Sequence, residues 1–177
     1  IHIYTKKSST EMNFAVIISK NDLAGVTIKE ALMRVYDFKE TGERFDDYPV
    51  YSFQSIKLYT TKTDSVHCER IDKKITADIY IFATKHQSQS EIPSLSVHSI
   101  GNWGVAEREY GGRDNTLCIS PSNYLKEALI FLEKNNMCGF EVIQESTHHG
   151  PYLEKPVMFI EIGSSPKQWD DKDAAET

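Results

Sequence analysis

The sequence predicts an α/β fold in which helices cover both faces of a mixed, mostly parallel sheet. Residues 79–84 (IYIFAT) and 157–162 are apolar along almost their whole length. Continuous apolar runs of this kind are typical of strands that are covered on both faces. Helical patterns separate these runs from other strand-like runs, and such alternation is typical of α/β sheets. The sequence therefore predicts one layered α/β domain.

Seven short segments are expected to be strands, because they are rich in apolar, β-branched and aromatic residues. They are residues 13–19, 49–53, 56–61, 79–84, 95–100, 140–143 and 157–162. Residues 64–74 are polar and show no clear pattern.

Three helices are expected from their start signals. The first begins at a capping box, Thr27 to Glu30, and runs to about Asp37. The second begins at Ser120-Pro121 and has apolar residues at helical spacing, from Leu125 to Leu132. The third begins at Ser165, where a capping box has proline at the first helical position. This third helix lacks a C-cap, which predicts that residues 12–177 are an incomplete version of a longer catalytic domain.

Composition places the chain among ordinary globular proteins. Its 177 residues are 40% hydrophobic and 26% charged, which fits about one domain. Residues 1–11 are expected to be a non-native or flexible extension. No apolar run reaches the roughly 20 residues of a membrane span, so no membrane partner is expected. Three widely spaced cysteines without a CxxC pair indicate reduced thiols and a cytoplasmic location.

Polar side chains follow three of the predicted strands. Lys85-His86 follows residue 84, Asn102-Trp103 follows residue 100, and His148-His149 follows the strand that ends near residue 146. Ligands of open α/β sheets bind outside the carboxyl ends of strands. These three clusters are therefore expected to line one site.

The histidines and two carboxylates of these clusters could bind zinc, which takes imidazole and carboxylate ligands. Glu161 is unusual because it lies in an apolar run and shares a strand face with Val157 and Phe159. Each residue also has a structural interpretation: a histidine or Glu161 could be a hydrogen-bonded core residue, and no HExxH or paired CxxC is present. The candidate metal ligands are His86, His148, His149 and Glu161, and the candidate catalytic residues are His86, His98, His148, His149 and Glu145.

Other polar groups are weaker candidates. Ser88 lies near His86, but the chain has no GxSxG nucleophile elbow. Gly111 and Gly112 could present amides to a phosphate, although a plain turn explains them as well. Trp103, between two glycines, could stack on a base or instead close the end of the sheet. The candidate substrate-binding residues are Lys85, Ser88, Asn102, Trp103, Gly111 and Gly112.

Four stretches together resemble the archaeal and plant type of D-aminoacyl-tRNA deacylase, a D-tyrosyl-tRNA deacylase-like family. They are FATKHQSQSEIPSLSVHSIGNWG, the YGG at residues 110–112, ESTHHGPYLEKP and FIEIGSSPKQW. The resemblance covers about residues 79–175 well and the segment before it weakly. It implies hydrolysis of the ester between a D-amino acid and the 3′ end of tRNA, which serves translation quality control. It also implies zinc as cofactor, and a fold similar to peptidyl-tRNA hydrolase and the phosphorylases.

The chain also differs from the family that it resembles. Family members continue into a glycine-rich GGGHY-type motif, and this chain has none, so it is expected to be truncated at its C-terminus, with uncertain activity. Two other function classes stay open: a peptidyl-tRNA hydrolase or nucleoside phosphorylase-like enzyme, and a non-catalytic fragment that binds tRNA ends or anions. The net charge of −6 argues mildly against a broad basic nucleic-acid surface. The sequence leaves open whether the chain is a monomer or a small homo-oligomer.

Overall fold

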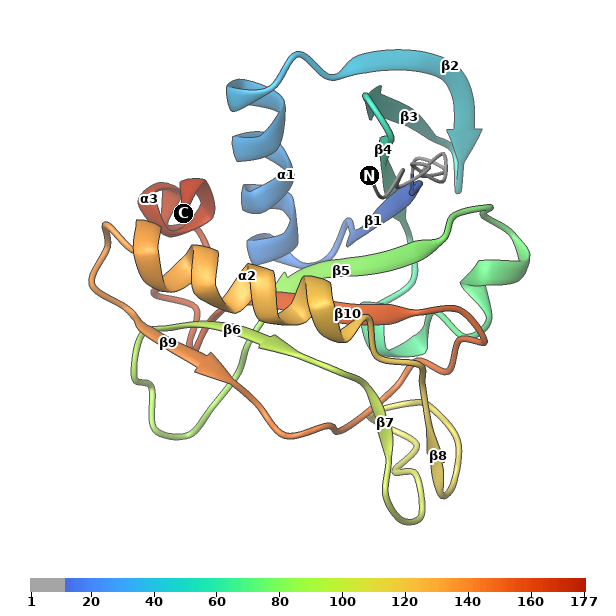
Figure 1. Cartoon of the computed structure of the whole chain (residues 1–177), viewed down its shortest axis with the longest axis vertical. Helices are drawn as coiled ribbons and strands as arrows, with labels where there is room; N and C mark the ends of the chain where they lie inside the picture. The colour runs from blue at the N-terminus through green and yellow to red at the C-terminus, as the bar shows by residue number, and fades with distance from the viewer. Residues whose placement is uncertain (1–11) are drawn as a thin grey trace, which may run out of the picture.

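One mixed sheet of eight strands dominates the part of the chain that the structure, a computed structural model, describes, which is residues 12–177 (Figure 1). The predicted extension at residues 1–11 lies outside the described residues. The strand order is β2-β3-β4-β1-β5-β10-β6-β9, and β7 and β8 pair separately as a small ribbon. The strands are β1 (Phe14–Ser19), β2 (Lys39–Phe45), β3 (Tyr48–Phe53), β4 (Ile56–Thr61), β5 (Ile79–Lys85), β6 (Ser94–His98), β7 (Gly101–Asn102), β8 (Thr116–Leu117), β9 (Glu141–Gln144) and β10 (Val157–Gly163).

Strand directions confirm the predicted mixed, mostly parallel sheet and add one feature that affects the site. The central strands β4, β1, β5 and β10 are mutually parallel. Strand β6 runs antiparallel to β10, and β9 runs parallel to β6. The carboxyl ends of β6 and β9 therefore point away from the carboxyl ends of β5 and β10. Side chains that follow these two pairs of strands cannot meet simply by lying at one edge of the sheet.

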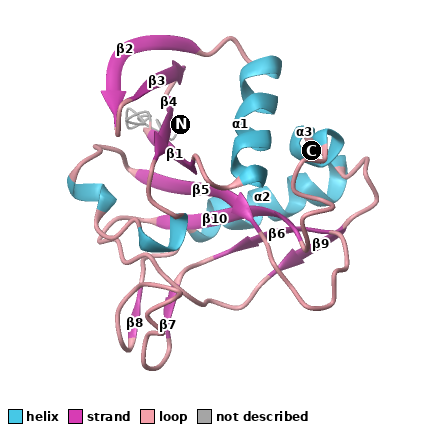
Figure 2. Cartoon of the chain, turned by 180° about the vertical axis from the view of Figure 1, so that it is seen from behind, coloured by secondary structure: helices cyan, strands magenta, loops and turns pink. Residues whose placement is uncertain are grey.

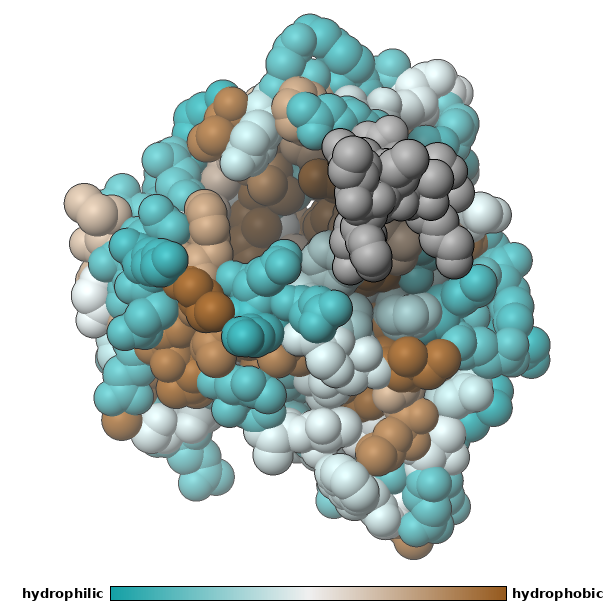
Figure 3. Space-filling model, in the orientation of Figure 1, coloured by the Kyte–Doolittle hydropathy of each residue, from teal (hydrophilic) through white to brown (hydrophobic). Residues whose placement is uncertain are grey.

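The three α-helices pack against one face of the sheet, and not against both faces as predicted (Figures 1 and 2). They are α1 (Leu23–Val35), α2 (Ser122–Asn135) and α3 (Lys172–Glu176). Every second residue of the central strands faces them, including Val16, Ala83, Met158 and Ile162. Hydrophobic residues gather in a hollow of this face beside α1, whereas its rim is mostly hydrophilic (Figure 3).

The opposite face is covered by loops and by two single-turn 3-10 helices, η1 (Ser65–His67) and η2 (Ile71–Lys73). Its core contains Tyr80, Phe82 and Phe159 of the sheet, packed with Ile71 and Leu153 of the loops. The rings of Phe82 and Phe159 stack with their centroids 4.8 Å apart. Short loops cover less of a sheet than long helices do, and this face is where the polar side chains gather.

The predicted start of the first helix is wrong. Helix α1 begins at Leu23, because the Asp22 carboxylate accepts a hydrogen bond from the Gly25 backbone N–H at 2.9 Å. Thr27, predicted as the capping residue, lies inside the helix and donates its hydroxyl to the Leu23 carbonyl. Asp22, five residues before Thr27, is also a residue type that commonly caps helices.

The predicted helix at Ser165 is also wrong. The Ser165 N–H and hydroxyl both donate to the Gln168 side-chain oxygen, so the expected local contact forms. The chain then makes a turn, and α3 begins only at Lys172, capped by Asp171.

Strand β2 was not predicted, because most of its side chains are exposed and it lies at the edge of the sheet.

Among the described residues, no helix has both the length and the hydrophobicity needed to cross a membrane. Cys68, Cys118 and Cys138 are all free thiols, as their spacing predicted. Burial raises the pKa of the Cys68 thiol to about 12, so this thiol is held protonated inside the core.

Candidate functional site

Glu161 is a buried carboxylate on the loop-covered face. It shares that face with Val157 and Phe159, as the strand pattern predicted, and only 3% of the residue is exposed. Its neighbours in register are Thr84 on β5 and Ser96 on β6. The Ser96 hydroxyl donates to Glu161 Oε2 at 3.3 Å. The sheet itself thus holds this carboxylate in a fixed position.

The His148-His149 turn folds back over the same face. It is anchored to the chain after β6, because His148 bridges to Ile100 and the Gly101 N–H donates to the His149 carbonyl at 2.8 Å. The next residue, Gly150, lies against the base of the β7–β8 ribbon. A Cβ at Gly150 would lie 2.2 Å from the backbone nitrogen of Gly112, so only glycine permits this approach.

His98, His148 and His149 form a compact cluster, called here the imidazole group. The ring centroids of His98 and His148 are 4.4 Å apart, and those of His148 and His149 are also 4.4 Å apart. His98 is fully buried and contacts Phe159. The turn therefore brings two loop imidazoles onto a histidine of the sheet.

Backbone carbonyls set the tautomer of all three imidazoles. The Nδ1 atoms of His98, His148 and His149 lie 3.0, 2.7 and 2.6 Å from the carbonyl oxygens of Ser99, Ser146 and Gly150. A carbonyl only accepts, so each Nδ1 carries a hydrogen, and in a neutral ring Nε2 then keeps its lone pair. The Nε2 atom of His98 is buried and has no hydrogen-bond partner in the structure.

His86, Glu145 and Glu161 form a second cluster, called here the carboxylate group. The His86 Nδ1 atom lies 3.1 Å from Glu145 Oε1 and 3.3 Å from Glu161 Oε2. Glu145 and Glu161 raise the pKa of His86 to about 10, so at neutral pH this imidazole is a cation between two carboxylates. Burial raises the pKa of Glu161, but contacts with His86 and His98 outweigh it and lower the pKa to about 2.

The two clusters meet at Glu161, whose other oxygen, Oε1, lies 3.6 Å from His98 Nε2. Glu145 also reaches across, with Oε2 3.8 Å from His148 Nε2. Burial, together with its imidazole neighbours, lowers the pKa of His149 to about 4. His149 is therefore neutral near pH 7 and keeps its lone pair.

Each cluster has a donor set that suits a metal ion. The candidate ligand atoms within each cluster all lie within 4.8 Å of one another. The imidazole group fits zinc best, because its Nε2 lone pairs are free and backbone carbonyls orient the rings, as is usual for histidines that bind metals. The carboxylate group instead satisfies its charges internally.

A family model described as D-aminoacyl-tRNA deacylase matches residues 73–177, which include all of these residues. The chain belongs to the D-aminoacyl-tRNA deacylase family. Curated relatives with this name include one from Thermococcus onnurineus, 38% identical over 161 residues, and one from Pyrococcus furiosus, 37% identical over 168 residues. These alignments cover 87% and 91% of this chain but 58% and 62% of the relatives. The chain thus spans about three fifths of the length of these deacylases.

Two solved structures agree with the fold. A crystal structure described as a conserved protein of unknown function is 32% identical, with a TM-score of 0.82, and the match covers 93% of this chain and 60% of that one. The futalosine hydrolase of Helicobacter pylori has a TM-score of 0.50 at 10% identity, with 94% of both chains covered. The second likeness concerns the fold alone, and it agrees with the predicted similarity to phosphorylase-like folds.

A cleft lies beside the two clusters. One cavity of about 550 Å³ and a neighbouring one of about 430 Å³ share five lining residues. The shared residues are Val66, Lys85, Tyr110, His149 and Glu161. The two cavities are therefore parts of one continuous cleft, and the six residues of the clusters line or adjoin it.

The other predicted site residues lie around this cleft. Lys85 lines it, with its ammonium 4.8 Å from the Trp169 ring centroid. Asn102 also lines it and donates to the Gly111 carbonyl at 3.1 Å. Trp103 is 73% exposed on the β7–β8 ribbon and does not line either cavity.

Three further predicted residues lie farther from the histidines. Ser88 lines an adjacent cavity, together with Tyr110. The Gly112 N–H donates to Glu69 Oε1 at 2.8 Å, and Gly111 packs on the Val66 carbonyl. The backbones of both glycines therefore contact neighbouring parts of the chain next to the β7–β8 ribbon.

Sequence reasoning missed Ser96 and Tyr110. Ser96 hydrogen-bonds Glu161, and its position two residues before His98 places both on one strand face, which was a usable signal. Tyr110 lines three cavities. The one sequence signal for it was its position directly before Gly111, which indicates a turn.

Proposed function

We propose that this chain hydrolyses the ester bond of D-aminoacyl-tRNA, which releases the D-amino acid and free tRNA. The observation that carries the proposal is the pairing of three tautomer-locked imidazoles with a buried imidazole–carboxylate cluster, in a chain of the deacylase family. The curated relatives carry the name of this activity. An ester hydrolase needs a group that activates water and a group that protonates the leaving oxygen, and the two clusters supply one of each.

We propose zinc as the cofactor, held by the Nε2 atoms of the imidazole group, with Glu161 beside them. Bound zinc lowers the pKa of a coordinated water to about 7 and polarises a carbonyl. The metal ligands predicted from sequence drew His148 and His149 from one cluster, and His86 and Glu161 from the other. The tautomers favour His98 over His86 as the third imidazole.

In this proposal the carboxylate group handles the proton. Glu145 and Glu161 hold His86 as a cation at the wall of the cleft. His86 would donate its Nε2 proton to the leaving ribose oxygen, and Glu145 would orient the His86 ring through its contact with Nδ1. Lys85 and Asn102 line the cleft at positions suited to the polar 3′ end of the substrate.

The test is a deacylation assay on D-Tyr-tRNA and L-Tyr-tRNA with the unaltered chain, His148→Ala and His86→Ala. The unaltered chain should hydrolyse the D-ester preferentially, and each variant should lose at least about 100-fold in rate. Gln144→Ala is the matched control, because Gln144 is an exposed residue of β9 just before the same loop. Full activity in both histidine variants would contradict the roles proposed for them.

Substrate controls separate the rival enzyme classes. N-acetyl-D-Tyr-tRNA is a substrate for a peptidyl-tRNA hydrolase, and a nucleoside with inorganic phosphate is a substrate for a phosphorylase. We expect no turnover of either. Turnover of one of them, without hydrolysis of D-Tyr-tRNA, would overturn the proposed function.

A further inference from the structure

Trp169 is a tryptophan outside the cleft that contacts two consecutive residues of the cleft lining. It lies in the turn of residues 166–170, where a helix was predicted, and it lines neither the 550 Å³ nor the 430 Å³ cavity. Its indole Nε1–H donates to the His86 carbonyl at 2.9 Å. The face of the same ring lies 4.8 Å from the Lys85 ammonium, which is a cation–π contact. No step of the proposed reaction uses this side chain directly.

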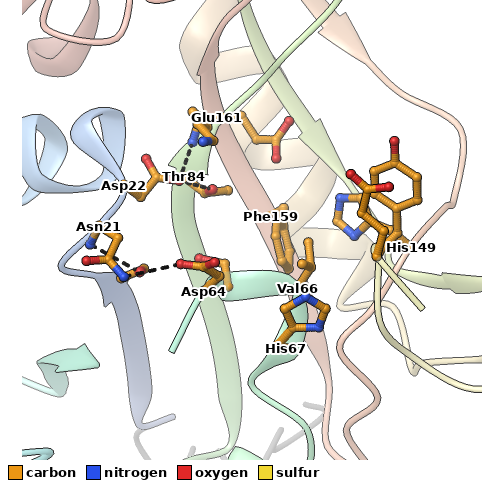
Figure 4. A pocket seen from close by; sticks show the side chains of 14 residues that line it. Asn21, Asp22, Asp64, Val66, His67, Thr84, His149, Phe159 and Glu161 are labelled. Carbon is orange, nitrogen blue, oxygen red and sulfur yellow. Dashed lines mark hydrogen bonds between the residues drawn. The ribbon is translucent and has the colours of Figure 1, made fainter. Parts of the chain in front are cut away.

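The chain is anchored to its neighbours immediately before His86. The Thr84 hydroxyl donates to the Asp22 carboxylate at 2.6 Å (Figure 4). The Lys85 backbone N–H donates to the same carboxylate at 3.1 Å. The His86 N–H then donates to the Ile162 carbonyl of β10 at 2.9 Å. These hydrogen bonds position the end of β5 and the nitrogen side of His86.

The carbonyl side of His86 lies beyond the sheet, and the indole holds it there. Strand β5 ends at Lys85, so the His86 carbonyl follows the last residue of the strand, and Trp169 is its donor. A Cβ at Gly163 would lie 2.5 Å from the His86 Cβ, so His86 packs directly against β10. The sheet and the indole therefore fix the His86 backbone together.

The orientation of the His86 ring depends on both ends of its side chain. Glu145 and Glu161 hold the ring at Nδ1, at 3.1 and 3.3 Å. A ring that is held at one atom alone can pivot about that contact, and the pivot moves its far nitrogen, Nε2. A fixed backbone removes this freedom, because it also fixes the Cβ end of the ring. A general acid must lie within hydrogen-bond reach of the oxygen that it protonates, so the ring orientation affects the rate.

Trp169 is itself held in place from two sides. Its ring packs against the apolar cluster under α2 and α3, which includes Leu95 of β6 and Ile162 of β10. The residue before it, Gln168, accepts hydrogen bonds at 2.9 Å from both the N–H and the hydroxyl of Ser165. The turn thus presents the indole to His86 from a fixed position. Partly buried tryptophans commonly hydrogen-bond through the indole N–H, so a purely structural role is the alternative to test.

We propose that Trp169 is a positioning residue that acts on the reaction through the His86 backbone. Its indole fixes the carbonyl side of His86, so that the ring held by Glu145 and Glu161 keeps one orientation at the wall of the cleft. This rests on the proposed function for the role of His86 as the general acid. Trp169 itself contacts neither the substrate nor the reacting atoms.

The first test follows the His86 ring by NMR, without any turnover. The imidazole ¹³C–¹H signals of the six histidines are recorded, and the His86 signal is the one lost in His86→Ala. Trp169→Phe keeps an aromatic ring but removes the N–H. We expect ¹³C relaxation to show a more mobile His86 ring in this variant, as a lower order parameter or as exchange broadening. A changed ring current alone would shift the signal without either effect.

Tyr124→Phe is the matched control. Tyr124 is a second partly buried aromatic residue of the same apolar cluster, and it lines neither cavity of the cleft. This variant also loses one polar hydrogen from an aromatic side chain, and it should leave the His86 ring unchanged. An unchanged His86 ring in Trp169→Phe, or an equal change in both variants, would overturn the proposal.

The second test measures D-Tyr-tRNA deacylation in a double-mutant cycle. Trp169→Phe should lower kcat about tenfold and leave KM within about twofold, because it misplaces a group and removes no substrate contact. In a His86→Ala background the same replacement should change the rate by less than about twofold, because the residue through which it acts is gone. A structural role would lower the rate equally in both backgrounds, and that result, or full activity in Trp169→Phe, would overturn the proposal.

A second replacement separates the hydrogen bond from the packing of the ring. Benzothienylalanine in place of Trp169 has nearly the shape of tryptophan but carries sulfur where the indole has its N–H. It should keep the melting temperature of the unaltered chain and still reproduce the mobile His86 ring and the tenfold loss in kcat. An unchanged His86 ring and full activity with this residue would overturn the role of the hydrogen bond, even if Trp169→Phe were poorly folded.

The two tests also separate this proposal from the proposed function. Suppose that the unaltered chain does not hydrolyse D-Tyr-tRNA, but that removal of the indole N–H mobilises the His86 ring. Trp169 then positions His86, and the proposed function is wrong. If instead the chain is active and the His86 ring is unchanged, the proposed function stands and the role of Trp169 is overturned.

Discussion

The imidazole group and the carboxylate group lie side by side on one face of the sheet, but their polar atoms are satisfied in different ways. In the imidazole group, each Nδ1 is engaged by a backbone carbonyl, which leaves the Nε2 atoms directed away from the backbone. In the carboxylate group, His86 is paired with Glu145 and Glu161, so side chains satisfy one another. The first arrangement leaves the Nε2 atoms available to a ligand, and the second places one cation between two carboxylates.

This difference teaches how one small site can separate two tasks. Backbone carbonyls orient each ring of the imidazole group, and burial lowers the pKa of His149 to about 4, so that ring stays neutral near pH 7. Carboxylate contacts favour the protonated ring of His86, which suits the proton-carrier role proposed for it. Four histidines close together therefore need not act alike, because their partners differ.

The largest expected effect is the loss of zinc binding when a histidine of the imidazole group is replaced. We expect His149→Ala to weaken zinc binding by more than about 100-fold, because it removes a ligand, whereas removal of an outer partner costs 10–100-fold. Zinc content of the purified chain after dialysis, measured by elemental analysis, checks this. Gln144→Ala should keep its zinc. Equal zinc in His149→Ala and the unaltered chain would show that the imidazole group does not bind it.

His86→Ala should give the complementary result. The rate of deacylation should fall by about 10²–10⁴-fold, the usual effect of losing a general acid, while the zinc content stays within twofold of the unaltered chain. Single-turnover kinetics and elemental analysis on one preparation measure both. Loss of zinc together with activity would mean that the two groups form one metal site.

The next effect concerns stability. Glu161→Gln should lower the free energy of unfolding by about 3 kcal/mol, because it leaves the buried partners of a charge pair uncompensated. Glu145→Gln should cost less, about 1 kcal/mol, since Glu145 is more exposed than Glu161. Urea unfolding of both variants tests the order. The reverse order would place the main charge partner of His86 at Glu145.

The smallest expected effect concerns the hydrogen bond from Ser96 to Glu161. Ser96→Ala removes the hydroxyl that donates to Glu161 Oε2 and should cost about 1 kcal/mol of stability. Zinc content should not change. A change in zinc content would show that Ser96 acts on the imidazole group as well.

Local patterns were sufficient for much of the fold. The apolar runs that became β5 and β10 were predicted within about one residue, because buried strands have few competing interpretations. The strand face of Glu161 was predicted correctly from its spacing to Phe159. The starts of α1 and α3 were not, because several residues offered acceptable caps and packing chose between them.

The sequence by itself identified the residues that we propose for the chemistry: four histidines and two glutamates beside or within strand-like runs. It could not determine how they meet. The prediction placed them at the shared carboxyl ends of strands, yet β6 and β9 run opposite to β5 and β10. The residues converge because the His148-His149 turn is bonded to the chain after β6 and packs on the β7–β8 ribbon. Such contacts join residues that are far apart in the chain. Only the tertiary structure could therefore decide which three imidazoles pack together and which imidazole pairs with the carboxylates.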